Sequence, residues 1–236
     1  MKDKMNLMRY SFVIGYFVTN VFLVIIFILS KWPKYWEHIN YEWSHLTWLS
    51  SVNLILIGIF CLIGFMITEL NSPVVLKKPI FSFIHRYIIG AMGLGFLFLA
   101  LDEKFQIHEK LREKVFIPNE VGTDIPGIGA GDFLHVIIAI VGLGMTYFIY
   151  QRIKISKISL GFYGAAVFMA LISVITDATS PVVRDDSQLS EAELMSSINH
   201  QFTEELFESS AIIFFAICFL NYFIVELELL IKSKEK

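Results

Sequence analysis

Charged residues are scarce in this chain. They make up 17% of its 236 residues, whereas an average soluble domain has about 25%. The net charge is −3, and the basic residues are scattered along the sequence. The chain therefore lacks the basic patch that a nucleic-acid partner requires, and we expect no nucleic-acid binding.

Cysteine is scarcer still, with only Cys61 and Cys218 in the chain. Both fall inside apolar runs, where we interpret them as small buried hydrophobic residues rather than as a disulfide or a zinc-thiolate pair. The first apolar run also lacks a small-residue cleavage site and is too long for the core of a signal peptide. We therefore expect this run to remain as a membrane span.

Long apolar runs, by contrast, fill most of the sequence. Hydrophobic residues make up 56% of the chain, and a helix that crosses a bilayer needs about 20 predominantly apolar residues. Six runs are near this length, at residues 10–30, 48–69, 80–101, 133–150, 159–176 and 209–231. We predict an all-α fold, a single integral membrane domain over residues 1–236 with six transmembrane helices.

Glycine and alanine are frequent in the third to fifth runs. Lipid gives apolar helices no hydrophobic reason to associate, so small residues that allow close approach supply the contact. We therefore expect runs three to six to form a tight bundle, with the first two runs flanking it.

The distribution of Lys and Arg predicts the orientation. With the N-terminus inside, 12 of the 19 basic residues fall in inner segments and 7 in outer segments. Because basic residues favour the cytoplasmic side, both termini are predicted to be cytoplasmic. The chain is then a multi-pass protein of the plasma (bacterial inner) membrane.

Sequence signals extend the helices beyond the apolar runs in two places. The third run continues in helical pattern through residues 101–116, as far as Pro118. Ser190 followed by Glu193 resembles a capping box, which predicts a helix that begins near Glu191 and runs into the sixth span. The first outer segment, 31–47, and its border carry the four tryptophans, which favour an anchor at the interface; a lid over an outer site is the alternative.

Acidic and histidine side chains gather at one end of four predicted spans. Successive spans run in opposite directions, so the end of one and the start of the next lie on the same, outer face of the membrane. The residues at these ends are Asp102, Asp132, His135, Asp177, His200, Glu204 and Glu208. They are therefore predicted to meet at a single depth.

Helical spacing groups these side chains further. On a continuous helix Asp102 and Glu109 differ by about 20° and share one face, and His200, Glu204 and Glu208 form a stripe with i, i+4, i+8 spacing. A charged side chain within the membrane costs roughly 2.5–3.5 kcal/mol unless it is paired or hydrated. A shared metal ion is the simplest mutual compensation. Helix capping is the structural alternative for Asp132 and Glu204.

The mixture of donors indicates which metal ions fit. Carboxylate and imidazole ligands suit zinc, iron or manganese, and the absence of thiolates argues against copper(I) and iron–sulfur clusters. The Glu-x-x-His motif of di-iron bundles is missing, which makes a di-metal oxidase the second choice. We expect a divalent metal, with zinc favoured over iron or manganese. The predicted ligands are Asp102, His135, His200 and Glu204, with Asp132 and Asp177 orienting them or completing a second site.

A mononuclear zinc site needs three protein ligands and an open position for water, and His135, His200 and one carboxylate, Asp102 or Glu204, could supply these ligands. Glu208 and Glu109 are the predicted acid–base groups beside that water. The stretch Leu-Asp-Glu-Lys-Phe-Gln-Ile-His-Glu at 101–109 resembles an LDExxxxHE signature of uncharacterised bacterial multi-pass membrane proteins. This resemblance covers nine residues; it implies that the positions form a motif and names no reaction.

The leading hypothesis is a metal-dependent membrane hydrolase that acts on a lipid or amphiphile at the outer interface. An ion- or proton-coupled transporter or channel is the second hypothesis. Against it, the middles of the spans offer only Asn20, Asn53 and Asn221 as strongly polar groups. A non-enzymatic membrane subunit or sensor that binds a divalent cation is the third. The sequence predicts membrane lipid as a partner and leaves the oligomeric state open.

Overall fold

The fold comes from a computed structural model that describes residues 2–40, 44–71, 79–119, 121, 133–178 and 190–234. These residues form helices, turns and bends, with no strand among them. The elements are α1 (Lys2–Ser30), α2 (His45–Asn71), α3 (Pro79–Phe105), α4 (Ile107–Leu111), a π-helical turn η1 (Arg112–Phe116), α5 (Phe133–Ile153), α6 (Lys157–Ala178) and α7 (Glu191–Lys234). Each predicted apolar run lies within one long helix, which confirms the all-α prediction.

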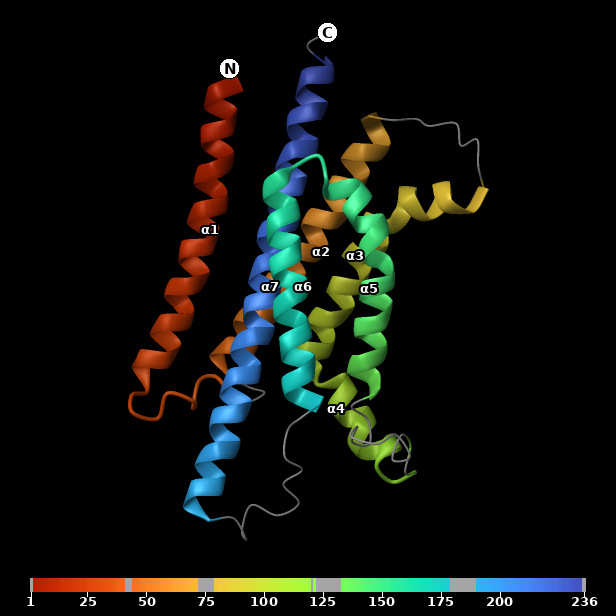
Figure 1. Ribbon diagram of the computed structural model, residues 1–236. Helices are drawn as coiled ribbons and strands as arrows, with labels where there is room; N and C mark the ends of the chain where they lie inside the picture. The colour runs from red at the N-terminus through yellow and green to blue at the C-terminus, as the bar shows by residue number, and fades with distance from the viewer. Residues whose placement is uncertain are drawn as a thin grey trace.

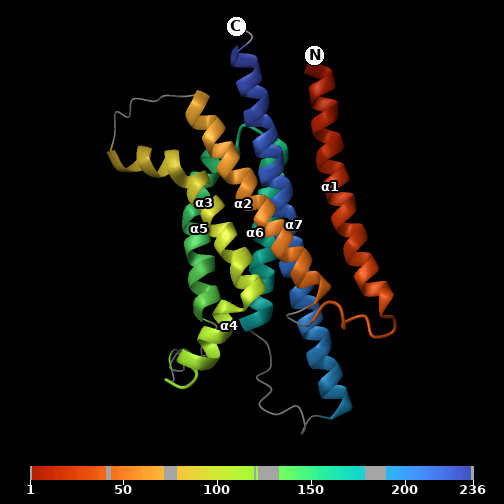
Figure 2. The ribbon, with the colours of Figure 1, turned by 180° about the vertical axis from the view of Figure 1, so that it is seen from behind.

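Helix α7 is the central element of the bundle. It packs against α6, α2 and α1, while α3 packs on α2 and α5 lies against α3 and α6. Figures 1 and 2 show α1 standing at the edge of the bundle, with both chain termini at the same end. Four of the described helices are long and apolar enough to cross a membrane, over Leu7–Ser30, His45–Leu70, Lys157–Thr176 and Glu191–Lys234. Their length and composition indicate a membrane protein.

The core is formed where α7 packs against α2 and α6, with side chains of α3 and α5 contributing to the same cluster. Phe219 and Tyr222 of α7 are fully buried together with Ile57 and Cys61 of α2. The thiols of Cys61 and Cys218 are free and buried, as expected for small hydrophobic side chains. In lipid, such packing stabilises the bundle through van der Waals contact rather than through removal of apolar surface from water.

Close packing through glycine occurs between α2 and α3 rather than in the expected place. A Cβ atom on Gly58 would lie 2.7 Å from Leu97 Cγ, and one on Gly93 would lie 3.0 Å from the carbonyl oxygen of Gly58. Glycines in α5 and α6, such as Gly144 and Gly164, have nothing within 4 Å of a Cβ. The prediction that the second span only flanks the bundle is therefore wrong, because α2 lies against both α3 and α7.

The extension of the third run contains a break that the sequence pattern did not predict. Gln106 has φ 53°, a left-handed conformation that costs a non-glycine residue roughly 1–2 kcal/mol. It ends α3, and α4 leaves at a different angle (Figures 1 and 2). Lys110 Nζ donates a 2.6 Å hydrogen bond to the carbonyl oxygen of Phe105, at the exposed helix end. The single continuous helix predicted for residues 101–116 is thus wrong.

The predicted extension of the sixth run is confirmed. Ser190 Oγ accepts a 3.4 Å hydrogen bond from the Glu193 amide, and Glu193 Oε2 accepts a 2.9 Å bond from the Ser190 amide. This reciprocal pair is the capping box expected from the sequence. From it α7 runs without interruption for 44 residues. Its first five turns, residues 191–208, therefore form an arm ahead of the apolar section.

Candidate functional site

The polar helix ends all lie at the end of the bundle opposite to the chain termini. Figure 1 shows the ends of α3 and α6, the start of α5 and the first turns of α7 at this end, together with α4. Antiparallel alternation of the helices produces this arrangement. The prediction that these ends share one side of the molecule agrees with the fold.

His200 and Thr176 join two of the polar ends directly. The Nε2 atom of His200 on α7 lies 2.8 Å from the carbonyl oxygen of Thr176, near the end of α6. A carbonyl oxygen only accepts hydrogen bonds, so Nε2 must carry the hydrogen. In the neutral ring the lone pair then lies on Nδ1. This pattern, with one ring nitrogen donating to a backbone carbonyl, is typical of histidines that bind a metal through the other nitrogen.

The half-buried side chains of Glu204 and Glu208 follow His200 along one side of α7. At 100° per residue they lie about 40° and 80° around the helix from His200. The three residues form the predicted stripe, and we call this set the α7 stripe. Ser209, next to Glu208, is buried and shares a 2.9 Å hydrogen bond with Ser50 of α2. The last member of the stripe therefore lies where α7 enters the packed core.

The segment after α1 covers the other side of α7. The ring of Tyr35 packs edge-on against Phe202, with centroids 4.9 Å apart, and Tyr35 donates a hydrogen bond to Asn199. Asn40 Nδ2 donates a 2.8 Å bond to the carbonyl oxygen of Ile198. Phe202 is about 160° around the helix from His200. The described part of this segment thus braces the α7 arm on the face away from the stripe, and does not act as a lid over it.

Asp102 and Glu109 are separated by the break at Gln106. The Gln106 amide donates a 2.7 Å hydrogen bond to the carbonyl oxygen of Asp102, which closes the last turn of α3. Asp102 is half-buried on that turn. Because α4 begins after a left-handed residue, the two carboxylates do not belong to one continuous helix face. The predicted 20° relation between them is therefore wrong.

For the other predicted site residues, either the whole residue or its side chain is outside the described part of the structure. Asp132 lies outside the described residues. His135, Asp177 and Glu109 belong to α5, α6 and α4, but their side chains are not among those described. Among the side chains that are described, no group of three or more His, Cys, Asp or Glu residues gathers closely enough to hold a metal ion. The ligand set thus stays a prediction.

A histidine pair near the start of α2 was not singled out by the sequence analysis. The rings of His38 and His45 lie with their centroids 4.1 Å apart, nearly perpendicular to each other. Partial burial, together with the charges of His45 and Lys31, lowers the pKa of His38. Glu37 forms salt bridges with Lys31 and Lys34, at 3.3 and 3.4 Å, which lower the pKa of its carboxyl group. The spacing of seven residues between the histidines, across a turn, gave no periodic signal.

A second polar group lies at the opposite end of the bundle. Arg9 of α1 forms a 3.7 Å salt bridge with Glu228 of α7. Glu226 is 9% exposed and lies near Arg152 of α5 and Tyr222. These residues tie the ends of three helices together near the chain termini.

Comparisons with known proteins give a family and nothing more specific. A family model described as "Domain of unknown function (DUF8692)" matches residues 15–222. No curated protein and no solved structure matches the chain. The matched range begins within α1 and ends within α7, so it includes Asp102, Thr176 and the α7 stripe but not Arg9, Glu226 or Glu228.

Proposed function

We propose that this chain, which belongs to the family described as Domain of unknown function (DUF8692), is a metal-dependent membrane hydrolase. In this proposal it crosses the plasma membrane six times, with both termini in the cytoplasm. Its substrate is a lipid or another amphiphile at the outer interface. The presence of both termini at one end of the bundle supports an even number of spans (Figure 1).

The contact between His200 and Thr176 is the observation that carries this proposal. It places the α7 stripe beside the end of α6, where Asp177 follows Thr176 in the sequence. It also assigns the hydrogen of the neutral ring to Nε2, which leaves Nδ1 as the coordinating atom. A half-buried helix end with an oriented imidazole and two carboxylates one and two turns further is suited to binding a divalent cation.

Each proposed residue has a separate chemical task. Asp102, His135, His200 and Glu204 would hold the ion, with Asp132 and Asp177 orienting these ligands. When bound, zinc would lower the pKa of a coordinated water towards neutrality. Glu208 accepts a proton from the attacking water and returns it to the leaving group, so that the scissile bond is broken and no net proton is consumed on the enzyme. Glu109 is the second candidate for this role.

Proton-coupled transport is the second candidate function. It is favoured by Glu226, which is 9% exposed inside the last apolar helix and lies near Arg152 and Tyr222. Ionisable side chains within membrane spans commonly belong to ion or proton paths. Proton flux into liposomes that is lost in Glu226→Gln and kept in His200→Ala would favour transport over hydrolysis.

Elemental analysis of the detergent-purified protein tests the proposed function. The wild type is compared with Asp102→Ala, His200→Ala and the matched control His38→Ala, all purified without chelators. We expect near-stoichiometric zinc, iron or manganese in the wild type and the control, and its loss in the two site variants. Metal retained in both site variants, or absent from the wild type, would contradict the proposal.

A further inference from the structure

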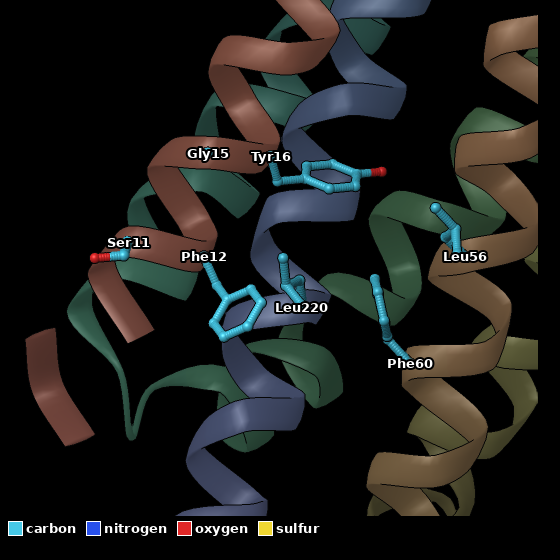
Figure 3. A pocket seen from close by; sticks show the side chains of 7 residues that line it. All are labelled: Ser11, Phe12, Gly15, Tyr16, Leu56, Phe60 and Leu220. Carbon is cyan, nitrogen blue, oxygen red and sulfur yellow. The ribbon is translucent and has the colours of Figure 1, made fainter. Parts of the chain in front are cut away.

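An apolar groove runs between α1 and the rest of the bundle. It has a volume of about 470 Å³ and is lined by Ser11, Phe12, Gly15, Tyr16, Leu56, Phe60 and Leu220. These residues come from α1, α2 and α7, and we call the space the α1 groove. Figure 3 shows the side chains of Phe12, Leu220 and Phe60 around it, between α1 and α2. The groove lies far along the bundle from the α7 stripe and is independent of the proposed function.

Tyr16 closes one end of the groove. Its ring reaches from α1 towards α2 (Figure 3), and its hydroxyl group donates a hydrogen bond to Asn53. Asn53 in turn donates a 2.8 Å bond to Asn20. The polar atoms at this end are thus bonded to each other, while the rest of the lining is hydrocarbon apart from Ser11, whose hydroxyl bonds to its own helix. Apolar spaces of this kind hold apolar ligands rather than water.

The size of the groove decides between a lipid chain and a partner helix. On α1 the lining runs only from Ser11 to Tyr16, less than two turns of a helix. A partner helix that crosses the membrane would need the whole length of α1. An acyl chain is much thinner than a helix and as apolar as the leucine and phenylalanine side chains that line the space.

The charge at the open end selects the headgroup. Beyond Ser11, towards the N-terminus of α1, the groove faces the end of the bundle that carries Arg9. Helix α7 ends on the same side with Lys232 and Lys234. Basic residues at a membrane surface attract anionic lipids, by about 1 kcal/mol for each Lys or Arg. The acidic side chains described at this end are Glu69 of α2 and Glu226 and Glu228 of α7; Glu226 lies near Arg152, and Glu228 forms a salt bridge with Arg9. We propose that the α1 groove holds one acyl chain of an anionic phospholipid whose headgroup lies at this end, towards Lys232 and Lys234.

Gly15 makes the proposal testable, because a Cβ atom there would have nothing within 4 Å. Gly15→Leu adds a side chain on the groove side of α1, and Leu56→Trp enlarges one on α2. Gly144→Leu on α5, where a Cβ also has nothing within 4 Å, is the matched control. Native mass spectrometry then measures how tightly each detergent-purified protein binds phosphatidylglycerol and phosphatidylcholine with the same acyl chains. Circular dichroism and gel filtration establish that each variant is folded. If one of the two filling variants fails to fold, the other still tests the proposal.

We expect the wild type and Gly144→Leu to bind one phosphatidylglycerol tightly and phosphatidylcholine weakly. The introduced side chain occupies the space of the acyl chain, so we expect phosphatidylglycerol binding to weaken roughly tenfold, equivalent to about 1.4 kcal/mol, in Gly15→Leu and Leu56→Trp. Equal binding in the wild type and a folded filling variant would overturn the proposal. Equal affinity for the two lipids would also overturn it. So would a wild-type dimer without bound lipid that becomes a monomer in the filling variants, because a second copy of the chain would then occupy the groove.

Discussion

Asn53 on α2 donates a 2.8 Å hydrogen bond to Asn20 on α1. Both side chains are buried, and Asn53 also accepts a hydrogen bond from Tyr16. Helix α1 otherwise meets the bundle through few buried side chains, among them Val13 against Ile213 and Ile217 of α7. The polar contact therefore fixes the position of the most weakly packed helix, and its removal should have a measurable effect.

Replacing Asn53 with Ala should loosen α1. Hydrogen bonds between membrane helices contribute about 0.6 kcal/mol on average and up to about 1.7 kcal/mol, so we expect a destabilisation in this range. Denaturant unfolding in detergent measures it. Ser11→Ala is the control, since the Ser11 hydroxyl bonds only to Leu7 of its own helix. An equal loss of stability in both variants would show that the contact between Asn53 and Asn20 has no special role.

Replacing Gly93 with Ala should destabilise the contact between α2 and α3. The new methyl group would lie 2.9 Å from Leu62 Cγ and 3.0 Å from the Gly58 carbonyl oxygen, and overpacking of this kind costs about 1–3 kcal/mol. Gly95→Ala is the matched control on the same helix, because a Cβ there meets nothing within 4 Å. Thermal unfolding followed by circular dichroism compares the two. A stable Gly93→Ala protein would contradict the close approach of these helices.

Protein stability should fall as the pH drops below about 6.5, in part because of His38. The pKa of His38 is lowered from 6.5 by partial burial and by the charges of His45 and Lys31, while Glu37 opposes this shift. The unfolded chain then binds the proton more readily than the folded chain, so acid favours unfolding, whereas above pH 6.5 the effect vanishes. Melting temperatures of the wild type and His38→Gln at pH 5.5 and 7.5 test this. The variant should show the smaller difference; an equal difference in both proteins would refute it.

Replacing Ser190 with Ala should fray the start of α7. The variant loses the side-chain bond to the Glu193 amide and the bond from the Ser190 hydroxyl to Glu193, and loss of an N-cap costs about 1 kcal/mol. Hydrogen exchange of the first turns of α7 should accelerate by roughly fivefold for that energy. Ser196→Ala, an exposed position further along the helix, should exchange like the wild type. Unchanged exchange in Ser190→Ala would show that packing alone fixes this helix end.

The long helices and the α7 arm followed from local patterns. An apolar run of membrane length has only one way to satisfy its backbone within lipid, which is to form a helix, so the six runs located the helices. The capping box at Ser190 is equally local, since its two partners are three residues apart. The break at Gln106 was missed because glutamine gives no signal for a left-handed conformation. That one residue changed the predicted relation between Asp102 and Glu109.

The sequence by itself determined that this protein is helical, that its composition is that of a membrane protein and that its polar helix ends lie on one side. Those properties depend on composition and on the alternation of helix direction. Only the tertiary structure decided which helices touch: α2 beside α3 through Gly58 and Gly93, and His200 beside Thr176. Helices in lipid associate through shape and single hydrogen bonds rather than through burial of apolar faces. Such contacts depend on the rotation and depth of each helix, which the hydrophobic pattern leaves undefined.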